Sequence, residues 1–235
     1  MPGDGGAGGG DLLLVGSGGF GRETAQAVHA LNASGGAWRL LGYVDDNPER
    51  HGTMVAGSVV LGGRDVLRQR PDAAVVVCTG RPGDYTSRVR IVGELGLPPE
   101  RYATIVHPSA AVSASSSLGP GCVLLAHVAL TAGVRVGAHV AIMPQATLTH
   151  DDVIGDFATI ASGARLGGGA RVGPAAYIGA GATIGEGRTV GAFALVGMGA
   201  VVTRDVPPRE VWAGVPACHR RPADLPHDFP ELASL

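Results

Sequence analysis

A histidine and a carboxylate stand side by side in one segment of the sequence, in an order suited to general base catalysis. Residues 149–157 read Thr-His-Asp-Asp-Val-Ile-Gly-Asp-Phe. A histidine can take a proton from an attacking hydroxyl or amine, and an adjacent carboxylate orients the imidazole and raises its basicity. His150 and Asp151 are therefore candidate catalytic residues, and an exposed surface histidine is the alternative. His107, His127 and His139 have no acid beside them and carry no such expectation.

A repeat of six residues surrounds this segment and must position it. From Val106 to Val202 every sixth residue is Val, Leu or Ile, and small or β-branched residues dominate four positions further on. A period of six fits neither a helix nor a plain antiparallel strand. It is typical of a triangular solenoid, in which each hexapeptide forms one short strand and a corner, and about 18 residues complete one coil.

The coil length predicts a neighbour for His150. Gly168 follows it by 18 residues, so the two should stack on adjacent coils at the ordinary strand spacing of about 4.8 Å. A bare glycine N–H can approach a reacting carbonyl unobstructed and stabilise the negative charge that develops there. The spacing therefore places a possible backbone donor beside the candidate base.

The region before the repeat predicts a small α/β unit. A buried strand at 12–15 leads into Gly-Ser-Gly-Gly-Phe-Gly at 16–21 and a helical stretch from about residue 22 to residue 31. This G-x-G-x-x-G spacing lets backbone N–H groups approach a phosphate, although a glycine turn that merely packs helix on strand is the alternative. Further strands are expected at 40–44, which ends in Asp45-Asp46, and at 73–78. Only residues 1–104 precede the repeat, which favours a mononucleotide over a dinucleotide.

Composition sets the organisation and excludes several partners. We expect a disordered tail at 1–10, a first domain at 11–104, a solenoid at 105–222 and a C-terminal tail at 223–235. The net charge is −2 without a basic face, which argues against nucleic acid. The three cysteines are widely spaced, which favours a reducing cytosol over a disulfide framework. The sequence shows neither a signal peptide nor an apolar run long enough to span a membrane, so a cytoplasmic protein is expected.

The order of motifs resembles the NeuD and PglD type of bacterial sugar acyltransferases from residue 11 to residue 222. The resemblance rests on Gly-Ser-Gly-Gly-Phe-Gly-Arg-Glu, Gly-Tyr-Val-Asp-Asp-Asn-Pro, Val-Leu-Gly-Gly, the hexapeptide repeat and the string at 149–157. It implies a Rossmann-like domain that holds a nucleotide-sugar acceptor, a left-handed β-helix, a homotrimer, and acetyl-CoA seated between neighbouring prisms. It also implies His150 as base and Asp151 as its partner. The implied coenzyme contacts are Thr159, Gly168, Ala180 and Met198, and the implied acceptor contacts are Gly18, Gly19, Phe20, Asp45, Asp46 and Gly62.

Three residues depart from the family pattern. Phe20 stands where members usually have histidine, Met143 where they usually have asparagine, and Asp152 where they have cysteine or another small residue. Asp152 falls at an interior corner position, so its carboxylate must find hydrogen-bond partners or share a proton. These changes leave the base in place but can reshape the acceptor pocket.

Three other functions share parts of this pattern with a sugar acetyltransferase. A metal-dependent hydratase on this solenoid needs stacked histidines, but no two of His107, His127, His139 and His150 are separated by a multiple of 18, so we expect no metal. An acyltransferase for a non-sugar secondary metabolite and a non-catalytic nucleotide-sugar-binding protein both stay open. The identity of the acceptor, the choice between O- and N-acylation, and the length of the acyl group also stay open.

Overall fold

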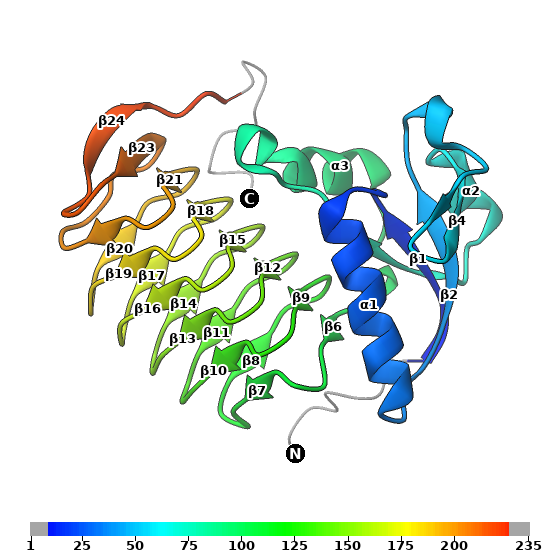
Figure 1. Ribbon diagram of the computed structural model, residues 1–235, viewed down its shortest axis with the longest axis horizontal. Coiled ribbons are helices and arrows are strands. Elements are labelled where there is room, and N and C mark those ends of the chain that lie inside the picture. The colour runs from blue at the N-terminus through cyan, green and yellow to red at the C-terminus, as the bar shows by residue number, and fades with distance from the viewer. Residues whose placement is uncertain (1–8, 226–235) are drawn as a thin grey trace.

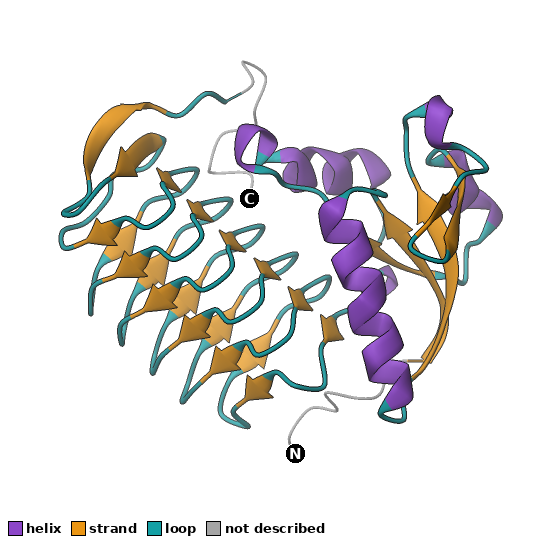
Figure 2. Cartoon of the chain, viewed as in Figure 1, coloured by secondary structure: helices purple, strands orange, loops and turns teal. Residues whose placement is uncertain are grey.

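The protein consists of a small α/β unit followed by a parallel β-helix (Figure 1, Figure 2). The computed structural model describes residues 9–225. Residues 1–8 of the expected N-terminal tail and 226–235 of the expected C-terminal tail lie outside the described residues. Gly9 and Gly10, which the sequence predicts to be part of the tail, belong to the first strand. No helix in the described part of the chain has the length and hydropathy needed to cross a membrane.

A five-stranded sheet forms the centre of the N-terminal unit. Its order is β3-β4-β2-β1-β5. β1 pairs in parallel with β2 and β5, β2 pairs in parallel with β4, and only β3 is antiparallel. The three predicted strands are present, and β3 and β4 are additional. The bounds are β1 Gly9–Val15, β2 Ala37–Val44, β3 Met54–Val55, β4 Ser58–Gly62 and β5 Ala74–Val77.

Helices cover both faces of this sheet. α1 (Gly19–Ala33) packs Ala25 and Val28 on the face that carries Leu12 and Leu14. α2 (Asp65–Gln69) and α3 (Ser87–Leu95) contribute partly buried residues to the core on the opposite face. Short 3-10 helices occupy Pro48–Arg50, Pro82–Asp84 and Pro99–Arg101.

The second unit consists of two-residue strands that form three parallel sheets. Each strand pairs with the one 18 residues before or after it, as in Leu130 with Leu148 and Leu148 with Leu166. The predicted hexapeptide register is therefore confirmed. The strands are β6 Ile105–Val106, β7 Ala111–Val112, β8 Ser117–Leu118, β9 Val123–Leu124, β10 Ala129–Leu130, β11 Arg135–Val136, β12 Ala141–Ile142, β13 Thr147–Leu148, β14 Val153–Ile154, β15 Thr159–Ile160, β16 Arg165–Leu166, β17 Arg171–Val172, β18 Tyr177–Ile178, β19 Thr183–Ile184, β20 Thr189–Val190, β21 Leu195–Val196 and β22 Val201–Val202.

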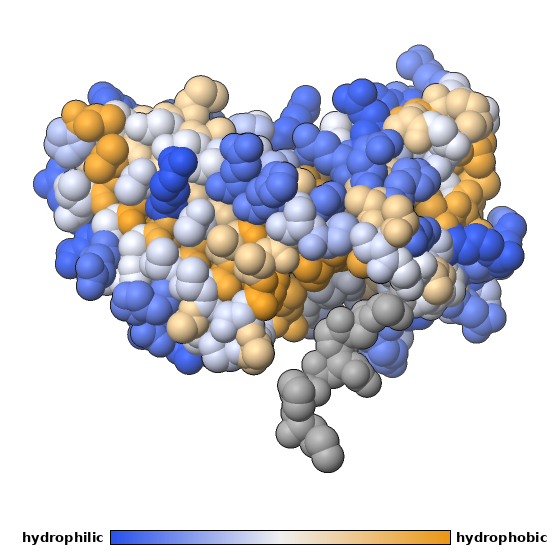
Figure 3. Space-filling model, turned by 60° about the horizontal axis from the view of Figure 1, so that its bottom comes forward, coloured by the Kyte–Doolittle hydropathy of each residue, from blue (hydrophilic) through white to orange (hydrophobic). Residues whose placement is uncertain are grey.

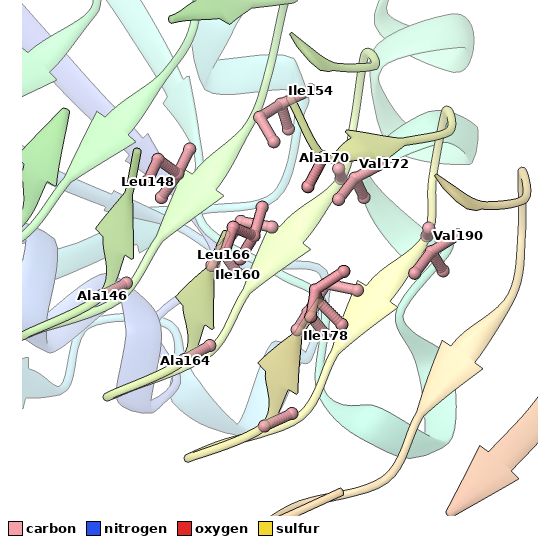
Figure 4. Close-up of a cluster of buried hydrophobic side chains, with 14 of the residues drawn as sticks. Ala146, Leu148, Ile154, Ile160, Ala164, Leu166, Ala170, Val172, Ile178 and Val190 are labelled. Carbon is pink, nitrogen blue, oxygen red and sulfur yellow. The ribbon is translucent and has the colours of Figure 1, made fainter. Parts of the chain in front are cut away.

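The prism interior is filled by the register residues. Leu148, Ile160, Ile178 and Val190 are almost completely buried, and alanines such as Ala164 occupy the space beside them (Figure 4). Burial of an aliphatic side chain of this size contributes about 1.5–3 kcal/mol. The regular core therefore fixes where each corner projects.

A hairpin closes the C-terminal end of the prism. β23 (Glu210–Ala213) pairs in parallel with β21, and β24 (Cys218–Pro222) returns antiparallel to it. The chain remains in contact with the protein just beyond this hairpin, because the Ala223 N–H donates to the Arg209 carbonyl at 2.9 Å. At the other end of the prism, Ile105 and Leu125 share a core cluster with α1 and β1, which joins the two units.

Candidate active site

His150 and Asp151 lie on the corner between β13 and β14. The His150 Nδ1 atom is 3.0 Å from Asp151 Oδ2. This hydrogen bond raises the pKa of the imidazole, and the charge of the carboxylate acts in the same direction. The side chains are 61% and 74% exposed. Within one chain the imidazole is therefore oriented by the carboxylate and exposed at the surface.

The predicted neighbour of His150 is in contact with it. A methyl group on Gly168 would overlap the imidazole at Nε2, so the ring lies directly over this glycine. The Gly169 N–H also donates to the His150 carbonyl at 2.8 Å, which ties the two coils together. Within residues 9–225 the Gly168 N–H donates to no protein acceptor. The corner thus presents a base and an unused backbone donor on adjacent coils.

The backbone of Asp151 carries a signal that the sequence reasoning missed. Asp151 has a φ of 64°, in the left-handed region that L-residues seldom adopt. The residues at the same place on the neighbouring coils are Gly133, Gly169 and Gly187, with φ values of 69°, 71° and 65°. Asp151 therefore keeps a side chain at a corner where the neighbouring coils have glycine.

A cleft of about 540 Å³ lies between the N-terminal unit and the prism. Its wall includes Gly18, Gly19, Phe20 and Asp45, which were predicted to bind the acceptor. The N–H groups that begin α1 lie beside the same loop, where a helix N-terminus favours an anion. The prism contributes Ala141, Met143, Thr159 and Tyr177 to the opposite wall.

Asp45 organises the glycine loop. It accepts hydrogen bonds from the Ser17 N–H at 2.9 Å and from the Ser17 hydroxyl at 2.5 Å, and the Arg50 guanidinium donates to that hydroxyl at 2.7 Å. Partial burial acts to raise the pKa of Asp45, but the hydrogen bonds and Arg50 outweigh it, so the pKa is lowered. Asp45 is therefore an ionised carboxylate at the rim of the cleft.

Two other predicted acceptor contacts lie outside the cleft wall. Asp46 pairs with Arg64 at 2.9 Å. The Gly62 carbonyl accepts a hydrogen bond from the Asp45 N–H at 2.9 Å, so Gly62 supports the strand end that carries Asp45. Neither residue is among those that line the cleft.

Arg88 on α3 lines the cleft, and no motif in the sequence pointed to it. It is 2% exposed, and its guanidinium donates to the carbonyls of Thr79, His139 and Phe157. Burial lowers the pKa of Arg88 to about 10, so the group remains charged. It also donates to the Thr159 hydroxyl at 2.6 Å. Thr159 is consequently buried at the junction between the two units.

The other predicted coenzyme contacts occupy a different edge of the prism. Ala180 and Met198 are exposed and stack on adjacent coils at the corner between the β18 and β19 faces, and the Gly199 N–H donates to the Ala180 carbonyl at 2.8 Å. The structure thus brings Gly168 to His150 but places neither Thr159 nor this second edge beside them within one chain. Among residues 9–225 no group of three or more His, Cys, Asp and Glu side chains is placed to hold a metal ion.

A histidine paired with an acid beside an unused backbone amide, on a parallel β-helix, is an arrangement compatible with acyl transfer. Neither a protein-family model nor a curated protein matches the chain, but solved structures do. The acetyltransferase domain of PglB from Neisseria gonorrhoeae in complex with acetyl coenzyme A is 30% identical over 91% of this chain and 100% of that chain, with a TM-score of 0.76. A histidine-to-alanine variant of GDP-perosamine N-acetyltransferase from Caulobacter crescentus, in complex with CoA and GDP-perosamine, is 29% identical over 90% of this chain and 97% of that chain, with a TM-score of 0.79.

A third similar structure, WeeI from Acinetobacter baumannii, is 26% identical over 89% of this chain and 99% of that chain, with a TM-score of 0.74. The chain belongs to the hexapeptide-repeat sugar acetyltransferases, the group to which the sequence motifs point. It is an acetyltransferase.

Proposed function

We propose that this enzyme transfers the acetyl group of acetyl-CoA to the amino group of a nucleotide-linked sugar, with His150 as general base. The contact of His150 with Asp151 and with Gly168 carries the proposal. The similar structures from Caulobacter and Neisseria, which hold CoA with GDP-perosamine and acetyl-CoA respectively, support the choice of donor and acceptor.

The proposed mechanism assigns one step to each residue. His150 Nε2 removes a proton from the acceptor amine as it attacks the thioester carbonyl, and Asp151 stabilises the imidazolium that forms. The Gly168 N–H donates to the oxyanion of the tetrahedral intermediate. The carbon–sulfur bond then breaks, His150 returns a proton to the leaving thiolate, and the products are the N-acetylated sugar and the free thiol.

The cleft is the proposed acceptor site. The N-terminal unit that borders the cleft has a mainly parallel sheet and a glycine loop that leads into the N-terminus of α1. These features support the interpretation of residues 11–104 as a Rossmann-like nucleotide-binding domain, with the phosphates near Gly18 and Gly19. Asp45 then accepts hydrogen bonds from hydroxyl groups of the nucleotide or the sugar. Phe20 and Met143 pack on one apolar cluster beside this cleft, which favours a sugar with an apolar substituent. The same wall is also compatible with a non-sugar metabolite as the acceptor.

A homotrimer is the proposed assembly, because one chain cannot complete the site. The cleft borders the prism face formed by β12, β15 and β18, whereas His150 lies on the corner between the other two faces. The packed interior of the prism separates the two places. We infer that the base of one chain serves the cleft of another, and that the Ala180–Met198 edge borders the coenzyme between left-handed prisms. Apolar residues lie among polar ones on the exposed prism surface (Figure 3).

The test is a comparison of His150→Ala with His127→Ala, a matched change at another corner histidine. His150→Ala should lower kcat by about 10² to 10⁴, the usual contribution of a general base. Acetyl-CoA affinity, measured by calorimetry, should change little, and His127→Ala should retain normal turnover. The assay follows thiol release from acetyl-CoA against a panel of nucleotide amino sugars, nucleotide sugars without an amine and hydroxylated metabolites. Near-normal turnover by His150→Ala would overturn the assignment of the base.

A further inference from the structure

Asp152 is a buried acid directly beneath the candidate active site. Its side chain is fully buried, and no other Asp or Glu between residues 9 and 225 is buried to this degree. The residues at the same place on the neighbouring coils are Val134 and Ala170, both without a polar side-chain atom. An ionisable group in this interior column is costly unless its oxygens are satisfied.

Both carboxylate oxygens are in fact used, and they connect two corners. Oδ2 accepts a hydrogen bond from the Thr149 N–H at 2.8 Å. Oδ1 accepts one from the Ala170 N–H at 2.8 Å. Thr149 immediately precedes His150, and Ala170 lies two residues after Gly168. One side chain therefore links the segment that carries the base to the segment that carries the backbone donor.

We propose that Asp152 is a positioning residue whose carboxylate fixes the His150 corner against the Gly168 corner. The inference rests on the proposed function in taking His150 as the base. Loss of the carboxylate would leave two buried N–H groups without an acceptor, so the corner would shift to reach other partners. A small displacement of a base from its working position can lower a rate by about 10²-fold.

The proposed role of Asp152 can also be tested through its charge, which affects the pKa of His150. The pKa of His150 is raised chiefly by the hydrogen bond with Asp151 and by the charges of Asp151 and Glu186. The carboxylate of Asp152 adds a smaller effect in the same direction. Burial raises the pKa of Asp152 itself to about 6, and the charge of Asp151 acts in the same direction. The two N–H donors and His150 lower this pKa but do not outweigh burial. The link between the corners should therefore weaken as Asp152 takes up a proton below about pH 6.

The experiment compares Asp152→Ala and Asp152→Asn with Ser116→Ala. Alanine occupies the same interior place at Ala170, so Asp152→Ala should fit the prism. Ser116 is the matched control, because it lies two coils earlier in the same column and makes the same kind of link. Its hydroxyl accepts from the Val134 N–H at 3.1 Å and donates to the Thr131 carbonyl at 2.8 Å.

We expect Asp152→Ala to lower kcat by about 10- to 100-fold with little change in acetyl-CoA affinity. In Asp152→Asn the pKa of the His150 imidazole, followed by NMR titration, should fall, and the acid limb of kcat should move to lower pH. We expect the wild-type enzyme to lose additional activity below about pH 6 as Asp152 is protonated, and we expect Asp152→Asn not to show this additional loss. Ser116→Ala should leave kcat and the imidazole titration unchanged.

Two results would overturn the proposal. One is a reduced melting temperature in Asp152→Ala with an unchanged kcat, which would make the link purely structural. The other is an unchanged His150 pKa in Asp152→Asn. The imidazole titration does not depend on turnover, so it distinguishes this failure from failure of His150 as the base. If Asp152→Ala does not fold, Asp152→Ser can be tested in its place, because a serine hydroxyl at this position copies the link made by Ser116. Asp152→Ser should fold and retain intermediate activity. A wild-type kcat in Asp152→Ser would also contradict the proposal.

Discussion

Asp151 combines a favourable side-chain contact with an unfavourable backbone conformation. Its left-handed φ is one that glycine adopts on the adjacent coils, and a non-glycine residue there costs about 1 kcal/mol. The carboxylate nevertheless reaches His150 Nδ1. The proposed role of Asp151 as the partner of His150 offers a reason for an acid, and not a glycine, at this place in the column.

This conflict predicts opposite effects on stability and activity. Asp151→Gly should leave the free energy of unfolding unchanged or raise it by up to about 1 kcal/mol, while kcat falls about 10-fold because the imidazole loses its orientation. Removing the carboxylate also lowers the pKa of His150, since the Asp151 hydrogen bond is the main reason that it is raised. Activity depends on the neutral imidazole and is lost as pH falls through this pKa, so the acid limb should shift to lower pH in the variant.

The measurements are urea unfolding and the pH dependence of kcat/KM. Asp151→Ala is the matched control, because it also removes the carboxylate but keeps a β-carbon in the left-handed conformation. It should show the same kinetic change with a lower stability. If Asp151→Gly instead unfolded more easily than Asp151→Ala, the backbone argument would be contradicted.

The residues of the site differ in how far sequence alone could locate them. The 18-residue spacing predicted that Gly168 would lie against His150, because the repeat leaves only one register. It also predicted that Asp152 must find partners, but not that these would be Thr149 and Ala170. Arg88 gave no signal, since an arginine in a short amphipathic segment usually faces solvent. Its role depends on contacts between segments about 50 to 70 residues apart in sequence.

At the scale of elements, α3 joins the cleft to the prism through Arg88. The Arg88 guanidinium donates hydrogen bonds to the carbonyls of Thr79, His139 and Phe157. No carboxylate pairs with Arg88 within residues 9–225, so neutral oxygens alone hold the buried charge. This arrangement is rigid, because a planar group with five donors fits only one placement of the helix on the prism.

We therefore expect Arg88→Met to lower the free energy of unfolding by about 2–4 kcal/mol, because several buried carbonyls lose their donor. Arg88→Lys should recover only part of this loss, since an ammonium cannot reach all the acceptors. Arg90→Met on the same helix is the control, and its exposed ion pairs predict a change of less than about 0.5 kcal/mol.

Each unit contains one tryptophan, Trp38 in β2 and Trp212 in β23, so unfolding can be followed separately in the two units after replacing the other tryptophan with phenylalanine. The Trp38 transition should move to lower urea in Arg88→Met, and the Trp212 transition should move less. Equal behaviour of Arg88→Met and Arg90→Met would show that the junction does not depend on Arg88.

Helices and strands could be predicted from the sequence where their residues follow a regular repeat. The solenoid strands were predicted because each one repeats the same aliphatic register. The strands β3 and β4 and the helices α2 and α3 were not, because each is short and its sequence does not repeat a regular pattern. α1 begins at Gly19 rather than near Arg22, since the Arg22 N–H already donates to the Gly18 carbonyl at 3.0 Å.

At the scale of the whole molecule, the cleft and the base face away from each other. A triangular prism has one edge opposite each face, and His150 stands on the edge opposite the face that borders the cleft. A cyclic assembly in which each chain lends its base to the next would solve this geometry with a single repeated contact. Neither the spacing of His150 nor the glycine loop alone could have revealed the separation, because it depends on which face receives the N-terminal unit.

This geometry predicts that two variants with different defects, one in the base and one in acceptor binding, can restore activity to each other. His150→Ala keeps the cleft and lacks the base, whereas Asp45→Ala keeps the base and should bind the acceptor with a higher KM but acetyl-CoA normally. The two chains are co-expressed with different affinity tags, and assemblies that carry both tags are purified. In a cyclic trimer with both kinds of chain, one of the three sites combines an intact cleft with an intact base. Activity at an acceptor concentration below KM should therefore recover to about one third of the wild-type value.

Mixed assemblies of two His150→Ala chains with different tags control for co-expression and should remain inactive. If each chain used its own base, every site in the mixed trimer would be defective, and turnover no higher than that of the two variants measured separately would refute the shared site.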